Sequence, residues 1–379
     1  MEKLLLIPGP SPVVPRVLEA LARPTVAHTS PETADDLKDA RTNLKAAVFT
    51  ASGEPIVFAG AGTLSMEVAL LNVAGPNDRV LVLSQGYFGD RMGQICEAFG
   101  IPFDILRSPW GRAVAAGELE SAVGRRRYGV VAVTHVDTGT GACAPVKAYA
   151  DVLKGRDAIT IVDGVCATGG IEERMDDWEI DIVLTAAQKC IGAPPGLAVA
   201  VFSERAVAKR RSLPSIPAYY ADLLRWLPSM KDPRVYFSTH GVNMIRAFAE
   251  ATRIMMEEGL PARFARHALN ARAIRAGLAR LGFSLFTGED FLASTLSVVR
   301  YPEGIDDAVF RRAYAESGYV VAGGLGETAG RVFRMGHMGN LTSVQALAAI
   351  ETMGRVLQAM GRPADVRGAV AAAEAVFSG

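Results

Sequence analysis

Residues 56–63 read IVFAGAGT, in which three apolar strand-forming residues run directly into small residues and a threonine. The following residues, Leu64 to Val73, have helical spacing, so the pattern predicts a strand, a tight turn and a helix. Small residues at such a turn let backbone N–H groups approach an anion at the helix N-terminus. A phosphate is the natural ligand of Ala61, Gly62 and Thr63, and an ordinary tight turn is the alternative.

The same alternation continues outward from this stretch to about residue 204. Five further apolar runs predict strands, at residues 79–83, 129–133, 158–162, 180–184 and 197–202. Segments with helical spacing separate several of them, such as Gly89 to Phe99. Strands that alternate with helices indicate parallel βαβ units in a doubly wound sheet, and continuous apolar strands indicate a sheet covered on both faces.

The pattern changes after residue 205. A stretch rich in proline and aromatic residues, 213–236, precedes two long helical patterns at 242–258 and 261–281. Short strands near 295–299 and 331–335 and two more helical stretches follow. With 379 residues, the chain is long enough for a large α/β domain and a smaller α+β domain.

Composition excludes several classes of function. Lys+Arg and Asp+Glu both number 40, which argues against nucleic acid or an anionic membrane as the main partner. The four cysteines have neither CxxC nor zinc-like spacing, so we expect no metal site and a reduced compartment. The N-terminal apolar run has only four residues, too short for a signal peptide or a membrane span. We therefore expect a cytoplasmic protein.

Two polar residues follow the predicted strands in an informative order. Asp163 ends an apolar strand, and Lys189 stands 26 residues later, between another strand and the turn Pro194-Pro195-Gly196. A partly desolvated lysine favours Schiff-base formation. In pyridoxal-phosphate (PLP) enzymes an Asp of this kind pairs with the protonated pyridine nitrogen. Alone, Asp163 could cap a turn and Lys189 could lie on the surface; the order phosphate loop, Asp, Lys is what favours PLP.

Two further features fit a ligand site. Tyr87 and Phe88 follow a strand, where either ring could lie on the face of a cofactor ring. Arg334 lies in a short predicted strand with apolar neighbours. A substrate carboxylate, bound bidentately, would explain an arginine there, and an internal salt bridge is the alternative.

Together these residues resemble the class V aminotransferases of the alanine–glyoxylate and serine–pyruvate kind. The likeness covers nearly the whole chain and rests on residues 8–11, 24–31, 59–63, 134–141, 162–170, 188–189, 323–326 and 334–336. It implies an α/β fold of type I, with a mostly parallel central sheet in a large PLP-binding domain (16–245). Residues 1–15 and 246–379 would form the small domain.

The resemblance implies a role for each matching residue. Lys189 would carry PLP and move the proton, and Asp163 would hold the pyridine nitrogen. Phe88 would stack on the ring and Thr138 would lie near the ring hydroxyl. The remaining residues implied are Ala61, Gly62, Thr63 and Gln188 for the phosphate; Tyr236 and Thr239 for the phosphate in the other subunit of a homodimer; and Gly9 and Arg334 for the substrate.

The implied reaction moves an amino group from a small amino acid, alanine or serine favoured, to a 2-oxo acid such as glyoxylate or pyruvate. Ala61 stands where relatives often have Ser, and residues 237–243 depart from the common form, which leaves the substrate open. Relatives that act on aminoethylphosphonate or ureidoglycine are alternatives. A cysteine desulfurase-like lyase usually has His before the lysine and a late catalytic Cys; this chain has Gln188, and no Cys after Cys190. A nucleotide-binding module without PLP is the alternative from another class.

Overall fold

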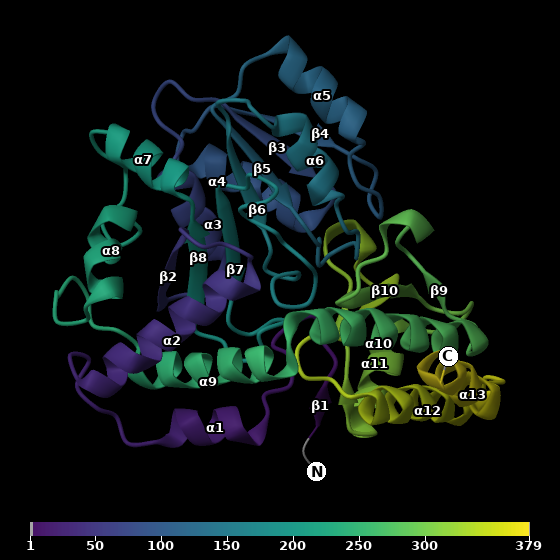
Figure 1. Cartoon of the computed structure of the whole chain (residues 1–379). Coiled ribbons are helices and arrows are strands. Elements are labelled where there is room, and N and C mark those ends of the chain that lie inside the picture. The colour runs from purple at the N-terminus through teal and green to yellow at the C-terminus, as the bar shows by residue number, and fades with distance from the viewer. Residues whose placement is uncertain (1–2, 379) are drawn as a thin grey trace.

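A seven-stranded sheet forms the centre of the larger part of the molecule (Figure 1). The structure, a computed structural model, describes residues 3–378. The strands are β2 (Glu54–Ala59), β3 (Val80–Ser84), β4 (Phe103–Arg107), β5 (Val130–Thr134), β6 (Ile159–Asp163), β7 (Ile182–Ala186) and β8 (Leu197–Phe202). Their order is β2-β8-β7-β6-β5-β3-β4, and only β8 runs antiparallel to its neighbours. The predicted mostly parallel sheet is confirmed.

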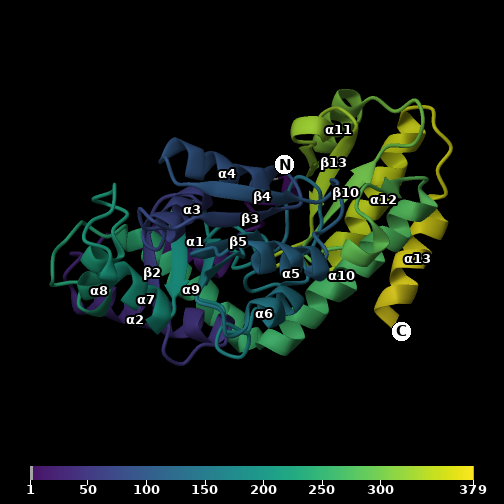
Figure 2. The same ribbon diagram turned by 90° about the horizontal axis from the view of Figure 1, so that it is seen from above.

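Burial explains why these residues form this sheet. Every residue of β3, β5, β6, β7 and β8 is buried. Figure 2 shows α3 (Gly62–Leu71) and α4 (Tyr87–Ala98) on one face, and α5 (Ala116–Arg125) and α6 (Val146–Leu153) on the other. Because helices cover both faces of the sheet, its strands are apolar at successive positions, and these continuous apolar runs allowed the strands to be predicted from the sequence. The edge strand β4 was missed because it is only half-buried and carries polar residues.

The remaining helices of this part lie around the β2 edge. They are α1 (Pro15–Ala22), α2 (Pro31–Ala47), α7 (Glu204–Ser212), α8 (Leu223–Lys231) and α9 (Val242–Glu258). α8 was not predicted; Asp222 caps its first turn, and its buried Trp226 stacks on Phe58 of β2. The proposed domain division at residue 245 falls inside α9, which packs against α1 and α2.

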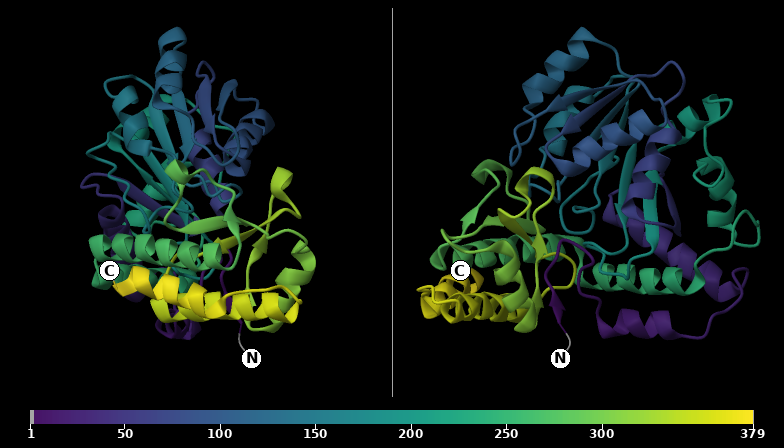
Figure 3. Two further views of the ribbon diagram at one scale, coloured as in Figure 1. Left: turned by 90° about the vertical axis from the view of Figure 1, so that its right-hand side faces the viewer. Right: turned by 180° about the vertical axis from the view of Figure 1, so that it is seen from behind.

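A smaller α+β part follows in sequence. Its elements are α10 (Leu260–Arg280), β9 (Ser284–Leu285), β10 (Leu296–Arg300), α11 (Asp307–Glu316), β11 (Tyr319–Val320), β12 (Ala322–Gly323), β13 (Val332–Gly336), α12 (Ser343–Ala359) and α13 (Val366–Ser378), with 3-10 turns at Glu289–Phe291 and Gly326–Thr328. β12, β13, β10 and β9 form an antiparallel sheet. The strand β1 (Leu4–Leu5) pairs with β11, so the first and the last of the described elements both belong to this part (Figure 3). Within residues 3–378, no helix is long and apolar enough to span a membrane.

Candidate active site

One cavity of about 170 Å³ brings together eight of the predicted site residues. They are Ala61, Gly62, Thr63, Phe88, Thr138, Asp163, Gln188 and Lys189, joined by three apolar residues that were not predicted, Met66, Val136 and Val165. The eight lie at or just beyond the carboxyl ends of β2, β3, β5, β6 and β7. Open α/β sheets bind their ligands at this edge, because the loops there converge on one crevice.

Asp163 is the buried carboxyl group of this cavity. Its side chain is 2 % exposed; Oδ1 accepts the N–H of Val165 at 3.0 Å and Oδ2 accepts the Thr134 hydroxyl at 3.3 Å. In residues 3–378 no Lys, Arg or His lies within 4.0 Å of it. Burial raises the pKa of Asp163 to about 7, helped by the nearby Asp137 charge and opposed by the Val165 hydrogen bond. Such a carboxyl group suits a cationic partner, as a protonated ring nitrogen would be.

Lys189 is held by the N-terminal segment. Its Nζ donates to the Pro8 carbonyl, and its backbone carbonyl accepts the Ser11 hydroxyl at 2.7 Å. Gly9 has φ +93°, and a Cβ there would lie 2.7 Å from Nζ, so a larger residue would displace the lysine. Gly9 therefore lies beside Lys189, although it does not line the cavity.

The other end of the cavity carries groups that suit a phosphate. α3 begins at Gly62 without a side-chain cap, and the N–H groups of Gly62 and Thr63 have no acceptor in the part of the chain described. Oε1 of Gln188 is buried without a hydrogen-bond partner. A Cβ at Gly62 would lie 3.1 Å from Val165, so the close approach requires a small residue. Free N–H groups at a helix start fit an anion, and the Gln188 amide would fit it as well once turned so that its N–H₂ takes the place of the unpartnered Oε1; these residues therefore fit PLP.

Phe88 and Thr138 flank the cavity, and Phe88 rather than Tyr87 lines it. Sequence reasoning gave no role to the residue that holds them, Asp137. Its carboxylate is 0 % exposed and accepts the N–H of Phe88 at 2.7 Å, of Gly139 at 2.8 Å and of Thr140 at 3.1 Å. One buried carboxylate thus ties the start of α4 to the loop that carries Thr138.

Arg334 reaches the same region from β13. Its Nε donates to the Gly323 carbonyl at 2.7 Å, and a terminal nitrogen lies 3.5 Å from the Thr138 carbonyl. Among residues 3–378 no carboxylate lies within 4.0 Å, so the internal salt bridge considered above is not formed. Burial lowers the pKa of the Arg334 guanidinium, as expected for a charge that lacks a counter-ion.

Arg91 was missed by sequence reasoning. It lies on α4 one turn after Phe88, and its guanidinium carbon is 5.0 Å from the ring centroids of both Tyr87 and Phe88. One terminal nitrogen lies 3.4 Å from the Thr63 hydroxyl. Only the helix register, which brings positions i and i+3 to one face, could have indicated this.

Tyr236 and Thr239 do not join the cavity within one chain. Both are exposed, Tyr236 by 65 %, and its ring packs edge-on against His28 at 5.6 Å. Their predicted role lies across a subunit boundary and stays a prediction.

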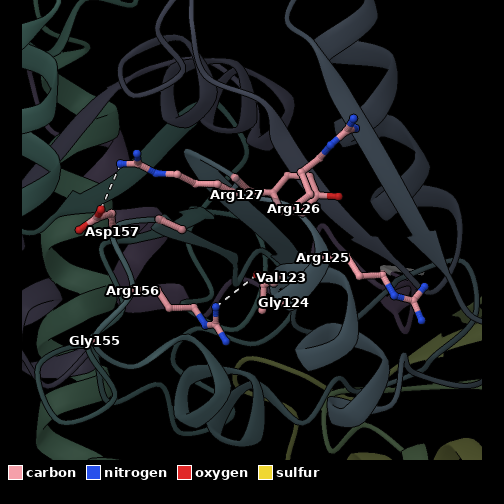
Figure 4. Close-up of a pocket in the computed structure, with 10 residues that line it drawn as sticks. Val123, Gly124, Arg125, Arg126, Arg127, Gly155, Arg156 and Asp157 are labelled. Carbon is pink, nitrogen blue, oxygen red and sulfur yellow. Dashed lines mark hydrogen bonds and ion pairs between the residues drawn. The ribbon is translucent and has the colours of Figure 1, made fainter.

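A second hollow, of about 430 Å³, is lined by Arg125, Arg126, Arg127 and Arg156 (Figure 4). Arg156 donates to Val123 and Val152 carbonyls at the ends of α5 and α6, and Arg127 pairs with Asp157. Basic residues of this kind compensate helix C-termini. This larger hollow contains none of the residues around Lys189, so the smaller cavity is the candidate site.

Comparison with known proteins agrees with this geometry. The family model of class-V aminotransferases matches residues 8–326. An uncharacterized aminotransferase of Methanocaldococcus jannaschii is 35% identical, covering 95% of this chain and 94% of the relative. An L-aspartate–glyoxylate aminotransferase of Paracoccus denitrificans is 32% identical, covering 98% and 95%. The solved ureidoglycine–glyoxylate aminotransferase of Bacillus subtilis superposes with a TM-score of 0.95 at 28% identity, covering 100% of this chain and 99% of that one.

The fold, the cavity and these matches agree, and the chain belongs to the class-V aminotransferase family of fold-type I, PLP-dependent transaminases.

Proposed function

We propose that PLP binds in the cavity around Lys189 with its two ends fixed. Asp163 would pair with the pyridine nitrogen, Phe88 would lie on the ring face, and Thr138 would lie near the ring hydroxyl. The start of α3, from Ala61 to Thr63, and Gln188 would hold the phosphate; a half-turn of the Gln188 amide would place its N–H₂ where Oε1 now lies without a partner. Bound PLP supplies an electron sink that makes the Cα–H of an attached amino acid acidic.

The protein's own groups would then move the proton and orient the substrate. Lys189 Nζ is the only lysine nitrogen lining the cavity in residues 3–378, so it would carry the proton between Cα and the cofactor. The Pro8 carbonyl accepts from Nζ and so fixes the position of the Lys189 side chain, which lines the cavity. The ionised Asp163 carboxylate would stabilise the positive charge on the pyridine nitrogen while Lys189 moves the proton.

We propose further that the substrates are a small amino acid, alanine or serine favoured, and glyoxylate or pyruvate. The observation that carries this proposal is Arg334, a half-buried guanidinium beside Thr138 without a counter-ion among residues 3–378. Its planar fork matches a carboxylate. The two relatives compared above that have a named reaction share glyoxylate as acceptor and differ in donor.

Ureidoglycine and aminoethylphosphonate remain alternative donors. A desulfurase-like lyase is disfavoured by the position of the cysteines: Cys190, the last in the sequence, is buried, and its Sγ lies 3.6 Å from the Cys166 carbonyl. No thiol is thus available on a late loop.

The test is a half-reaction screen of the PLP form against alanine, serine, aspartate, ureidoglycine and aminoethylphosphonate. The absorbance of the bound cofactor measures its conversion by each donor. Alanine or serine should convert it fastest. Arg334→Lys should lower kcat/KM for the α-amino acids by roughly 10²-fold, mainly through KM, without loss of PLP. Lys189→Ala, the negative control, should show no conversion.

Two results would contradict this proposal. Aminoethylphosphonate has no α-carboxylate. If it converted the PLP form faster than alanine and serine do, the donor would be an amine of that class and not a small α-amino acid. Full activity of Arg334→Lys on alanine would make Arg334 a structural residue.

A further inference from the structure

Arg91 does not line the cavity itself, but its charged group contacts Thr63, which does. Its two terminal nitrogens lie 3.4 Å from the Thr63 hydroxyl and 3.2 Å from the Tyr87 hydroxyl. The guanidinium also lies over the rings of Tyr87 and Phe88, each at 5.0 Å. The side chain is thus fixed between the start of α3 and the aromatic residues at the start of α4.

This charge has no counter-ion within residues 3–378, because no carboxylate lies within 4.0 Å. The adjacent Asp90 is engaged elsewhere, accepting the Ser84 hydroxyl at 2.9 Å and the Arg107 Nε at 3.1 Å. A guanidinium has five N–H donors, and the two contacts of Arg91 leave others free. A half-buried cation with free donors is costly unless an anion completes it.

The neighbourhood indicates which anion this is. Thr63 stands in the first turn of α3, where the N–H groups of Gly62 and Thr63 are also without acceptors in the described chain. A helix start and a guanidinium therefore direct positive potential at one point. When the Thr63 oxygen accepts from Arg91, its own hydrogen is free to point into the cavity.

We propose that Arg91 supplies the counter-charge for the cofactor phosphate and orients the Thr63 hydroxyl toward it. This inference rests on the proposed placement of the phosphate at the start of α3. Arg91 would act with the neutral donors of that turn, which by themselves leave a dianion only partly compensated.

The test compares two ligands that differ only in the phosphate. Apoprotein of wild type and of Arg91→Gln is titrated with PLP and with pyridoxal, and binding is followed by absorbance. Loss of the charge should weaken PLP binding about 10- to 100-fold, the range of a charge-assisted hydrogen bond, and leave pyridoxal binding unchanged. Arg91→Lys should recover part of the loss. Arg125→Gln is the matched control, since Arg125 is exposed on α5 without an ion pair in the described residues (Figure 4).

The other outcomes overturn the inference in distinguishable ways. Equal weakening of PLP binding and pyridoxal binding would show that Arg91 acts by holding the rings of Tyr87 and Phe88 in place. Unchanged PLP binding with a raised KM for dicarboxylic donors would assign Arg91 to a substrate carboxylate. Thr63→Ala tests the underlying placement: if it weakens PLP selectively and Arg91→Gln does not, only the Arg91 inference fails. If neither variant distinguishes the two ligands, the phosphate does not lie at the start of α3.

Discussion

Asp163 is a buried acid with no Lys, Arg or His of residues 3–378 within 4.0 Å, and this has a consequence for stability. Its pKa is raised by burial to about 7, whereas a carboxyl group in an unfolded chain titrates near 4. Between these values the folded apoprotein holds a proton that the unfolded chain has released. The free energy of unfolding of the apoprotein should therefore fall as pH rises through this window.

Asp163→Asn isolates this contribution, because an amide of the same shape does not titrate. Between pH 5 and pH 8 wild-type apoprotein should lose on the order of 2–3 kcal/mol more stability than the variant, measured by urea unfolding. With PLP bound, the variant should keep the cofactor but remove the substrate proton more slowly, by on the order of 3–5 kcal/mol in activation free energy. Parallel pH profiles of the two apoproteins would show that Asp163 stays ionised without PLP.

Residues of the site were predictable from sequence where a strand end places them. Asp163 and Lys189 stand at or just after apolar runs, and such runs locate the carboxyl edge of a parallel sheet. Asp137 and Arg91 were not found, because their roles depend on backbone N–H groups brought together by two loops and on the face of a helix. Nothing in local sequence encodes those contacts.

At the scale of elements, α4 depends on a residue from outside the helix. Its N-cap is Gly86, which has no side chain to accept the first N–H groups, and Asp137 accepts that of Phe88. Asp137→Ala would leave the N–H groups of Phe88 and Gly139 without acceptors, whereas the Thr140 N–H keeps the backbone carbonyl of residue 137 at 3.3 Å. The variant should cost about 2–4 kcal/mol of unfolding free energy.

PLP affinity should fall in the same variant, since Phe88 and Thr138 both lose their support. Asp151→Ala is a suitable control: its exposed pair with Lys147 should contribute less than about 1 kcal/mol. A loss for Asp137→Ala no larger than for the control, by urea unfolding, would show that water replaces the carboxylate.

Elements could be predicted where burial imposes a pattern. Residues 242–258 form a helix over the predicted range because one face is buried against α1 and α2. The edge strand β4 and helix α8 were not predicted, for two different reasons. β4 is half-exposed and polar, and α8 contains Pro228, which indicates an interrupted helix when only the sequence is considered.

For the whole molecule, the site depends on segments from both ends of the sequence. The N-terminal loop reaches Lys189, where the Ser11 N–H donates to the Gln188 carbonyl at 2.9 Å, and Arg334 arrives from the C-terminal sheet. Ordering the site therefore requires the two parts to dock. Neither part should bind PLP in a substrate-competent form alone.

A homodimer is the last expectation at this scale. Tyr219, Val235 and Tyr236 are exposed apolar side chains in and near the loop before α9, and Thr239 lies exposed beside them. Exposed apolar side chains that gather in this way are what we expect of an interaction surface. In a twofold dimer each such contact occurs twice, so Tyr236 and Thr239 could complete the partner's phosphate site.

Complementation of two inactive variants tests this arrangement. Lys189→Ala lacks the lysine but keeps Tyr236 and Thr239; the double variant Tyr236→Ala, Thr239→Ala keeps the lysine. If the contacts cross the dimer, each mixed dimer contains one intact site, because one subunit gives the lysine and the other gives the tyrosine and threonine. Unfolding and refolding an equal mixture should then restore about a quarter of wild-type activity by random pairing. Contacts within one chain would leave the mixture no more active than its two components, and a sedimentation coefficient of a monomer would remove the shared site altogether.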